Sequence, residues 1–491
     1  MPATEQLGSL VAVGFVGRTR ELALLDKRLS RVRSGDGGVA LAIRGRRQVG
    51  KSRLVQEFCD RTGVPYFYFT ATKGASPVEA VASFTRELRD SPLPRDAGLV
   101  PGLESGNWPD ALRVLAGALP ETPCVVVLDE LPWLAEQDGL FDGALQTAWD
   151  RLLSPRPVLL LLLGSDLHMM QRLTAYDQPF YGRADDFVLG PLNPAETGDA
   201  LGLTGADAID AHLVSGGLPG ILRAWPDAMP ASAFLEQECA DPASAVFSVP
   251  AASLLAEFPQ PDQARRVLEA VGAGERTHAN IAAAAGGREG AIPSGSLSPL
   301  LHRLTEDKHV LQIDNPLSTQ PGKPALYRIA DPSLRFYLAA LRQAEDLVRR
   351  GRTEAAYRLI ERRWHSYRGR AVEPLIREAL ELAAATGTLP WPEVAAVGGW
   401  WNRRFDPEID LVGADRSPTA RHIHFTGSIK WLQTPFDRHD LAAHHAATAQ
   451  VPGYEPGHTG TVIASLGGTD LPADSQVDAL WGPGEIIAAW R

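Results

Sequence analysis

The chain has 491 residues, a formal net charge of -11 and 22% charged residues, which fit a globular protein with more than one core. The negative charge argues against a protein that simply coats nucleic acid, and its three cysteines, far apart in sequence, fit reduced thiols. The sequence shows no signal-peptide pattern and no apolar run long enough for a bilayer, so we expect a cytoplasmic protein without a membrane partner.

The first 190 residues alternate short apolar runs with amphipathic stretches. Strands are predicted at residues 39–45, 64–70, 124–130, 158–164 and 186–190. Helical stretches lie between them, for example at 51–62 and 106–119. Alternation of this kind predicts an α/β fold, in which a parallel sheet is covered by helices on both faces.

The first motif is GRRQVGKS, which matches the pattern G-x-x-x-x-G-K-[ST] and lies between a predicted strand and a predicted helix. Its residues are Gly45, Arg46, Arg47, Gln48, Val49, Gly50, Lys51 and Ser52. Such a loop turns successive N–H groups toward phosphate oxygens, while the lysine reaches the β- and γ-phosphates and the Ser hydroxyl binds Mg²⁺. The alternative is a glycine-rich turn that matches by accident. We predict a P-loop that binds ATP and Mg²⁺.

Polar residues at the ends of later strands supply the other half of this predicted site. Asp129 would hold Mg²⁺ through water, and Glu130 would orient or deprotonate the attacking water. Ser165 either senses the γ-phosphate or caps the next helix. Arg183 either stabilises charge near the phosphates or forms a surface ion pair with Asp185 or Asp186.

The remainder of the chain divides into segments that differ in composition and in predicted secondary structure. Residues 193–258 are rich in Ala, Leu and Pro without a strand pattern and predict a helical appendage. Three short helices and two strands around a Pro- and Gly-rich turn follow from about residue 261, the pattern of a winged helix. Residues 333–385 predict helix, and the last hundred or so mix strands and helices as a small α/β domain.

Several motifs, in this order, resemble the archaeal-type ATPases of the STAND branch of P-loop NTPases, which are related to AAA+ proteins. They are FVGRTRELALL at 15–25, the two phosphate motifs, GSD, YGRA, SGGLPGIL and IADPSLRFYLAAL. The resemblance implies a sheet of strand order 5-1-4-3-2, with Val16 and Gly17 near adenine. It also implies that Gly217 to Pro219 sense the nucleotide from the helical subdomain.

The predicted domains follow from the resemblance together with the composition and predicted secondary structure of each segment. They are a P-loop ATPase core at 13–195, a helical subdomain at 196–258, a winged helix at 259–332, a helical linker at 333–370 and a restriction-endonuclease-like α/β domain at 371–491.

Two basic features raise the question of DNA binding. The winged helix would contact DNA through residues 296–305 and a wing near Lys323, or would pack against the ATPase as an intramolecular switch, which we prefer. The segment from Arg342 to Arg370 holds nine arginines against four acidic residues. A solvated helix face with ion pairs is its simpler explanation, and a contact to the DNA backbone is the alternative.

The C-terminal residues resemble the restriction-endonuclease-like domain that is often fused to archaeal-type ATPases. The corresponding residues are Glu373, Asp410, Ser428 and Lys430. Ser428 replaces the acid that such a site needs two residues before its lysine, so we predict a degenerate nuclease site in which Lys430 is kept as a partner of Asp410. Glu408 shares the face of Asp410 and is a conceivable substitute.

These features together predict an ATP-binding and ATP-hydrolysing STAND-type switch with an inactive nuclease-like domain, which forms a homo-oligomer when nucleotide binds. One alternative is an ATP-regulated, metal-dependent DNA nuclease that uses Glu373, Asp410 and Lys430. The other is a DNA-binding transcriptional regulator. The histidines near the C-terminus, including His439 and His444, lack a metal-ligand spacing and are interpreted as structural or solvated.

Overall fold

The structure is a computed structural model that describes residues 15–93, 106–258, 263–322 and 324–491. Lys323 of the predicted wing and the predicted domain starts at residues 13 and 259 lie outside these ranges. The chain divides into two units, residues 1–191 and 192–491. Each unit is described by itself.

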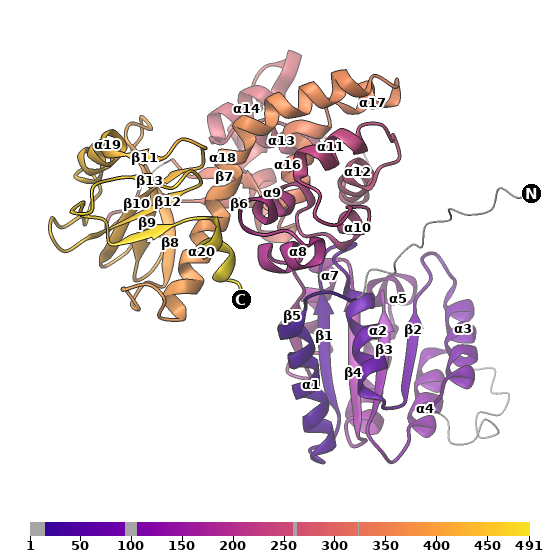
Figure 1. The fold of residues 1–491 in the computed structure, drawn as a ribbon. Coiled ribbons are helices and arrows are strands. Elements are labelled where there is room, and N and C mark those ends of the chain that lie inside the picture. The colour runs from indigo at the N-terminus through magenta and orange to yellow at the C-terminus, as the bar shows by residue number, and fades with distance from the viewer. Residues whose placement is uncertain (1–14, 94–105, 259–262, 323) are drawn as a thin grey trace, which may run out of the picture. The chain divides into compact units, whose positions relative to one another are not determined.

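A five-stranded parallel sheet forms the centre of the first unit (Figure 1). Its strands are β1 (Val39–Arg44), β2 (Tyr66–Thr70), β3 (Cys124–Asp129), β4 (Val158–Gly164) and β5 (Ala184–Val188). The strand order is β2-β3-β4-β1-β5, which confirms the predicted order 5-1-4-3-2. Every residue of β3 and β4 is buried, as expected for continuous apolar runs in a sheet covered on both faces.

Helices cover both faces of this sheet. They are α1 (Thr19–Arg33), α2 (Lys51–Thr62), α3 (Pro77–Asp90), α4 (Trp108–Ala118), α5 (Leu131–Gln137), α6 (Phe141–Ala148) with the π-helical turn η2 (Trp149–Leu153), and α7 (Leu167–Thr174). Side chains of α1 and α2 pack with Val125 and Val127, whereas α3 to α7 pack with Val126 and Leu128. Alternate residues of one strand therefore supply two separate cores.

The second unit begins with five helices, as predicted for residues 193–258. They are α8 (Pro194–Leu201), α9 (Gly205–Ser215), α10 (Pro219–Leu222), α11 (Ala231–Glu238) and α12 (Ala245–Glu257). Gly217, in the turn before α10, has a φ of 66°. A Cβ at this position would lie 2.0 Å from the carbonyl oxygen of Leu192, so both the backbone conformation and the packing require glycine here.

Three helices and a two-stranded antiparallel sheet follow, in the arrangement predicted from the sequence. They are α13 (Gln263–Gly272), α14 (His278–Gly286) with the short turn η3 (Gly287–Glu289), α15 (Ser294–His302) with the turn η4 (Arg303–Asp307), and the strands β6 (Leu311–Asp314) and β7 (Leu326–Ile329). Helix α13 packs against β7, so the helices and the hairpin form one body.

A long helix then leads into a mixed sheet. The helical part consists of α16 (Pro332–Phe336), η5 (Tyr337–Leu341), α17 (Glu345–Arg349) and α18 (Thr353–Ala385). The sheet has the order β14-β12-β10-β9-β8. Its strands are β8 (Ala396–Trp401), β9 (Glu408–Ala414), β10 (Ile423–Lys430), β12 (Gly460–Ser465) and β14 (Ala479–Trp481), and it is accompanied by β11 (Phe436–Asp437), α19 (Arg438–Thr448), β13 (Thr469–Asp470) and α20 (Pro483–Ala488).

One hydrophobic core runs through the second unit from Leu192 to Trp490. The C-terminal helix α20 packs against α8 and α9, and Arg491 forms an ion pair of 2.8 Å with Asp199. The predicted subdivision at residues 258, 332 and 370 is therefore a proposal about parts that share a core. No helix in the described part of the chain is both long and apolar enough to cross a membrane.

We predict that Leu161→Ala destabilises the first unit by about 2–5 kcal/mol, because Leu161 is fully buried at the centre of β4 and the cavity can collapse only in part. Leu140→Ala is the matched control, since Leu140 is 79% exposed and should change stability by no more than about 0.5 kcal/mol. Urea denaturation of both variants measures the difference. Equal losses in the two variants would contradict this packing.

Candidate functional site

The loop between β1 and α2 carries the first candidate site. Strand β1 ends at Arg44 and helix α2 begins at Lys51. Gln48 and Gly50 have φ angles of 63° and 96°, so the backbone curls in the left-handed region just before the helix. The first N–H groups of a helix have no partner within it and attract anions together with the helix dipole. The loop therefore has the backbone shape that binds phosphate groups.

Lys51 is held inside this loop. Its Nζ donates hydrogen bonds to the carbonyl oxygens of Gly45 at 2.7 Å and Arg46 at 3.1 Å. Burial lowers the pKa of Lys51, while the nearby carboxylates of Glu130 and Asp129 act in the opposite direction. The ammonium group thus lies between the loop and the acidic residues. Of the other loop side chains, Arg47 and Gln48 are exposed, whereas Val49 is buried.

The carboxylate of Asp129, at the end of β3, is the centre of a hydrogen-bond network. Its Oδ2 accepts bonds from the Ser52 hydroxyl at 2.7 Å and the Tyr68 hydroxyl at 2.8 Å, and its Oδ1 accepts from the Glu130 N–H at 2.9 Å. The tyrosine was not predicted. Its only sequence signal is the alternation of Tyr66 and Tyr68, which places both on one face of β2, the neighbour of β3. Burial and the charge of Asp129 raise the pKa of Tyr68, so this hydroxyl remains a donor.

Glu130 follows at the first position outside the strand, with a φ of 55°. Its Oε2 accepts a hydrogen bond of 2.8 Å from the hydroxyl of Ser165, which comes directly after β4. Ser165 does not cap the next helix, contrary to one of the two predictions for it. Asp166 is the N-cap of α7 and accepts from the N–H of Met169 at 2.9 Å. Three neighbouring strands therefore end at one group of polar side chains.

The residues before α1 are tied to the same loop. Arg18 is buried, and its guanidinium donates to the carbonyl oxygen of Val49 at 2.9 Å and to Glu21 at 3.2 Å. This contact was not predicted, although the arginine stands next to Val16 and Gly17 in the motif at residues 15–25. The contact of Val16 and Gly17 with adenine stays a prediction.

Arg183 lies at the other end of the sheet. It precedes β5, and Ala184 pairs with Ala40 near the amino end of β1, whereas the loop follows the carboxyl end of β1. Along β1, the five residues from Ala40 to Arg44 place Arg183 about 17 Å from the start of the loop. Arg183 forms an ion pair of 2.7 Å with Asp150.

Both predictions for Arg183 therefore fail within this chain. It does not lie beside the loop, and the two carboxylates expected as its partners pair with other arginines. Asp185 pairs with Arg28 at 2.8 Å and Asp186 with Arg44 at 2.7 Å. The parallel register brings Arg44 beside β5 and accounts for its pairing with Asp186, whereas Arg28 reaches Asp185 from α1.

Pro219 begins α10 in the second unit, directly after the turn that contains Gly217. Its predicted contact with a nucleotide stays a prediction.

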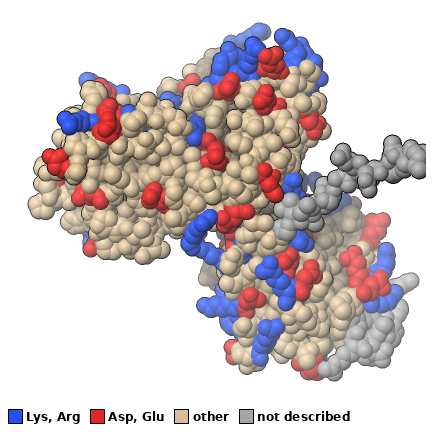
Figure 2. Space-filling model, in the orientation of Figure 1, with Lys and Arg blue, Asp and Glu red and all other residues tan. Residues whose placement is uncertain are grey.

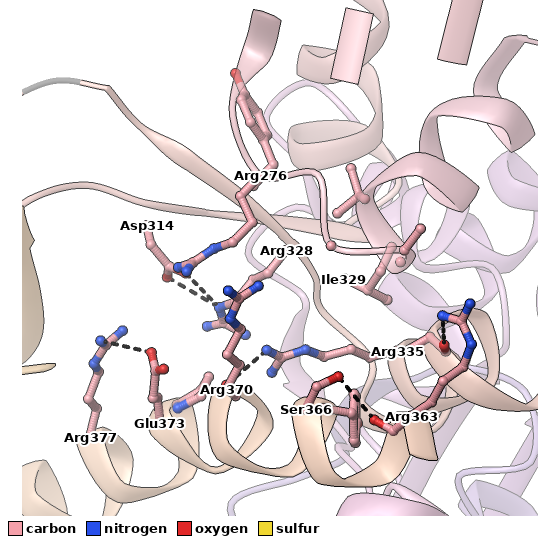
Figure 3. Close-up of a pocket in the computed structure, with 18 residues that line it drawn as sticks. Arg276, Asp314, Arg328, Ile329, Arg335, Arg363, Ser366, Arg370, Glu373 and Arg377 are labelled. Carbon is pink, nitrogen blue, oxygen red and sulfur yellow. Dashed lines mark hydrogen bonds and ion pairs between the residues drawn. The ribbon is translucent and has the colours of Figure 1, made fainter. Parts of the chain in front are cut away.

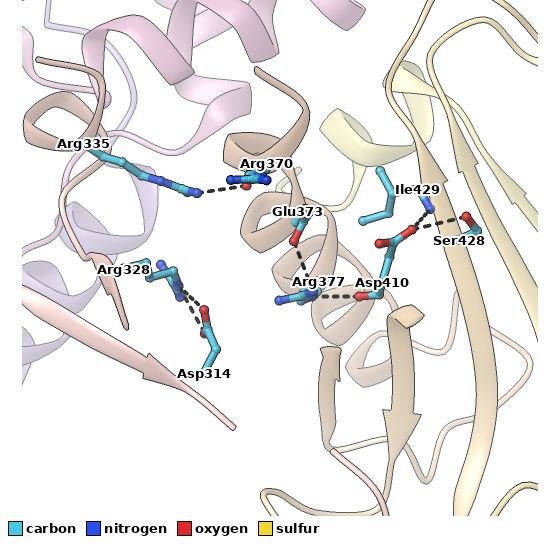
Figure 4. A network of polar contacts seen from close by, with 9 residues as sticks. All are labelled: Asp314, Arg328, Arg335, Arg370, Glu373, Arg377, Asp410, Ser428 and Ile429. Carbon is cyan, nitrogen blue, oxygen red and sulfur yellow. Dashed lines mark hydrogen bonds and ion pairs between the residues drawn. The ribbon is translucent and has the colours of Figure 1, made fainter. Parts of the chain in front are cut away.

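The second candidate site joins α18 to the C-terminal sheet (Figure 4). Asp410 of β9 accepts hydrogen bonds at Oδ2 from the hydroxyl of Ser428 at 3.2 Å and from the N–H of Ile429 at 2.8 Å. Arg377 of α18 donates to the carbonyl oxygen of Asp410 at 3.0 Å and to Glu373 at 3.4 Å. Glu373, Asp410 and Ser428 are thus brought together as predicted from the resemblance.

Lys430 is not part of this group, which corrects the prediction that it pairs with Asp410. Its Nζ donates to Asp440 at 2.6 Å and to the carbonyl oxygen of Pro435 at 2.9 Å. The ten residues after Lys430 fold back through β11 into α19, whose first turn contains Asp440. A contact within one short segment therefore holds the lysine.

The group around Asp410 does not fit a divalent metal ion. Ser428 is a neutral ligand, and the guanidinium of Arg377 brings a positive charge to Glu373. Within the described ranges, no three or more His, Cys, Asp or Glu side chains form a group that could hold a metal. Burial, followed by the charge of Glu373, raises the pKa of Asp410 to about 6. Burial lowers the pKa of His444 to about 4, and this ring lies 3.4 Å from the Thr426 hydroxyl inside the domain.

Comparison with sequence families supports the assignment of the first unit. Residues 14–161 match the family model of the AAA ATPase domain. Residues 337–441 match a second family model, described as archaeal and bacterial proteins of unknown function. The first match begins before β1 and ends within β4, and it therefore contains the loop, Asp129 and Glu130. The first unit thus has the P-loop NTPase fold and matches the AAA ATPase domain.

Three archaeal proteins of known structure are similar to this chain. A Walker-type ATPase of Pyrococcus abyssi has 18% identity and a TM-score of 0.48, with 66% of this chain and 96% of that chain covered. The ORC2 protein of Aeropyrum pernix, in ADPNP–ADP complexes, has 15% identity, a TM-score of 0.43 and coverages of 69% and 94%. Cdc6p of Pyrobaculum aerophilum has 16% identity, a TM-score of 0.32 and coverages of 71% and 98%. No curated protein matches the chain.

We predict that Asp410→Asn removes a pH-dependent part of the stability of the second unit. The folded-state pKa of about 6 lies above the value of about 3.9 for an unfolded aspartate. Between these values the folded chain keeps a proton that the unfolded chain has lost, so the free energy of unfolding falls as the pH rises from about 4 to about 6.

Urea denaturation of the wild type and of Asp410→Asn over this range measures the effect. The wild type should lose stability relative to the variant as the pH rises, and the difference should be constant above about pH 7. A difference that does not depend on pH would contradict the raised pKa.

Proposed function

We propose that the chain binds and hydrolyses ATP at the carboxyl edge of the first-unit sheet. The observation that carries this proposal is the continuous polar group formed by Lys51, Ser52, Asp129, Glu130 and Ser165, which follow three adjacent strands and a phosphate-binding loop. The match of residues 14–161 to the AAA ATPase domain supports it.

The loop and Lys51 would bind the phosphates. The first N–H groups of α2 offer hydrogen-bond donors, and the Lys51 ammonium offers a compact positive charge for the β- and γ-phosphates. The side chains of Arg47 and Gln48 are exposed and so leave the backbone of the loop accessible. Binding therefore rests on the main chain and one lysine.

The Ser52 hydroxyl and the Asp129 carboxylate fit Mg²⁺, because both are hard oxygen ligands. They lie side by side, since the hydroxyl donates a hydrogen bond of 2.7 Å to the carboxylate. Mg²⁺ commonly takes few protein ligands and completes its shell with water and phosphate oxygens. When bound here, it would neutralise charge on the phosphates. Tyr68 would hold Asp129 in the orientation that this requires.

Glu130 is the candidate base that orients or deprotonates the attacking water. Its backbone lies in the left-handed region, and the hydroxyl of Ser165 holds one of its carboxylate oxygens. Ser165 is therefore a positioning residue for Glu130 in this proposal. The prediction that Ser165 senses the γ-phosphate remains part of this proposal.

The proposal extends to a STAND-type switch in the cytoplasm. Nucleotide bound in the first unit would be sensed by Pro219 and the Gly217 turn, and the helices and hairpin at residues 263–329, proposed as a winged helix, would respond. Arg183 lies at the end of the sheet opposite the loop of its own chain, so a role in hydrolysis would require a second copy of the chain. A homo-oligomer formed on ATP binding is consistent with that position.

We predict that Lys51→Ala removes ATP binding, while Glu130→Gln keeps ATP binding and lowers turnover by about 10²–10⁴-fold. The first change deletes the only buried ammonium of the loop, and the second keeps the shape of Glu130 without its basicity. Equilibrium binding of ATP with magnesium and steady-state phosphate release measure the two steps. Unchanged turnover in Glu130→Gln would remove that residue from the mechanism, and no ATP binding by the wild type would end the proposal.

We predict that Ser165→Ala lowers kcat by about 2- to 12-fold with little change in KM, since the lost hydrogen bond of about 0.5–1.5 kcal/mol orients Glu130 and does not bind substrate. Ser165→Thr keeps a hydroxyl and should restore most of the rate. Steady-state kinetics of both variants measure the split. A raised KM with an unchanged kcat would assign Ser165 to substrate binding instead.

A further inference from the structure

A strongly basic pocket lies inside the second unit, beside the second candidate site, with which it shares Glu373 and Arg377 (Figure 3). Its volume is about 120 Å³. Two carboxylates, Asp314 and Glu373, line it, so the arginines exceed them by four. The six arginines are Arg276, Arg328, Arg335, Arg363, Arg370 and Arg377.

These arginines come from separate parts of the chain. Arg276 follows α13, Arg328 lies on β7, and Arg335 lies on α16. The other three lie on α18, at Arg363, Arg370 and Arg377. Figure 3 shows the first three side chains converging above α18. The fold therefore gathers positive charge that is dispersed over a hundred residues.

Only part of this charge is neutralised within the protein. Arg328 pairs with Asp314 at 3.1 Å, and Arg377 contacts Glu373 at 3.4 Å (Figure 4). No carboxylate of the described residues pairs with Arg276 or Arg370. The Nε of Arg363 is buried and has no hydrogen-bond partner in the described chain, although its NH1 donates to the carbonyl oxygen of Ala339 at 3.2 Å.

Arg335 lies deepest in this arrangement. It donates to the carbonyl oxygen of Arg370 at 3.0 Å, and its guanidinium lies 5.8 Å from the centre of the Tyr367 ring. Burial lowers the pKa of Arg335; Tyr367 and Glu373 act in the opposite direction, whereas the nearby positive charges of Arg328 and Arg276 lower the pKa further. Like charges at this depth repel each other in a medium that screens poorly. An anion inside the pocket would relieve that repulsion.

Neighbouring arginines of α17 and α18 behave differently. Arg349 and Arg358 form i,i+4 ion pairs with Glu345 and Glu354 on the surface. Figure 2 shows basic and acidic side chains interspersed at the α17 end of the second unit. This part of the segment from Arg342 to Arg370 is thus a solvated face with ion pairs. Arg363 and Arg370 instead line the pocket, with Arg363 partly buried and Arg370 exposed at its rim.

The chemistry of the pocket selects its ligand. Guanidinium groups present planar forks of N–H donors that match the oxygens of phosphate, and several forks around one point favour a group with more than one charge. Pockets that enclose a whole drug-sized ligand measure about 300–1,000 Å³. A volume of about 120 Å³ suits a single anionic group rather than a complete nucleotide.

We propose that this pocket is a phosphate-binding site, separate from the P-loop, which takes the phosphate group of a small phosphorylated molecule or of a nucleic-acid strand. The bound phosphate would join β7, α16 and α18 through their arginines. It would therefore stabilise the packing of the hairpin and the helices before it against α18.

The test uses the full-length chain carrying Lys51→Ala, so that phosphate binding at the P-loop does not contribute. Inorganic phosphate is titrated by calorimetry without magnesium, against sodium chloride of equal ionic strength. The test variant adds Arg276→Gln and Arg370→Gln, which break no ion pair with a carboxylate in the described chain. The control variant adds Arg362→Gln, which removes an exposed arginine of α18 that does not line the pocket.

We expect phosphate to bind the Lys51→Ala chain and the Arg362→Gln control equally, and the test variant at least about tenfold more weakly. Phosphate should also raise the thermal unfolding temperature of the first two proteins and not of the third. Circular dichroism verifies that all three are folded. Equal binding by the test variant, or no binding by the Lys51→Ala chain, would overturn the proposal whether or not the first unit hydrolyses ATP.

A competition experiment distinguishes the two sources of phosphate. A short single-stranded DNA with a 5′-phosphate and the same strand without it are compared as competitors of inorganic phosphate. Competition by DNA that depends on Arg276 and Arg370 would identify a nucleic-acid strand. Competition by pyrophosphate but by neither strand would identify a small phosphorylated molecule.

Discussion

The carboxylate of Asp129 is the contact on which the organisation of the first unit depends. It joins Ser52 of α2, Tyr68 of β2 and the N–H of Glu130, so that one buried acid connects the phosphate-binding loop with two strands. Hydrogen bonds to a charged group contribute about 1.5–3 kcal/mol each, and a buried carboxylate without them would be costly. The network therefore holds Ser52 and Glu130 on either side of one point, where the phosphates of a nucleotide and a water molecule would meet.

The two units use positive charge in different ways. In the first, one lysine and the N–H groups of a helix surround the proposed triphosphate site, and two carboxylates lie beside the ammonium. In the second, six arginines surround a pocket with two carboxylates, and its positive charge is therefore only partly balanced. A compact ammonium suits contact with a nucleotide that must be bound and released, whereas planar guanidinium forks suit a phosphate held between several elements.

The elements of the fold follow closely from local patterns. The helix predicted at 51–62 is α2, and the predicted strand 158–164 is β4, because apolar periodicity and the boundaries set by Gly and charged residues act over a few residues. Local sequence patterns did not predict the contacts between side chains that are distant in the sequence. Arg18 bonds to Val49, Arg183 pairs with Asp150 and Lys430 pairs with Asp440, and each partner was unforeseen or assigned to another residue.

The sequence by itself determined the P-loop, the strand order through a family resemblance, and the residues that end the strands, since the spacing of glycine, lysine and acidic residues specifies the backbone and the chemistry directly. Only the tertiary structure decided that Ser165 donates a hydrogen bond to Glu130, that Arg183 lies at the end of the sheet opposite the loop, and that six dispersed arginines line one pocket. The physical reason is that strand register and helix packing decide which side chains approach one another, and these depend on the whole core rather than on any local segment.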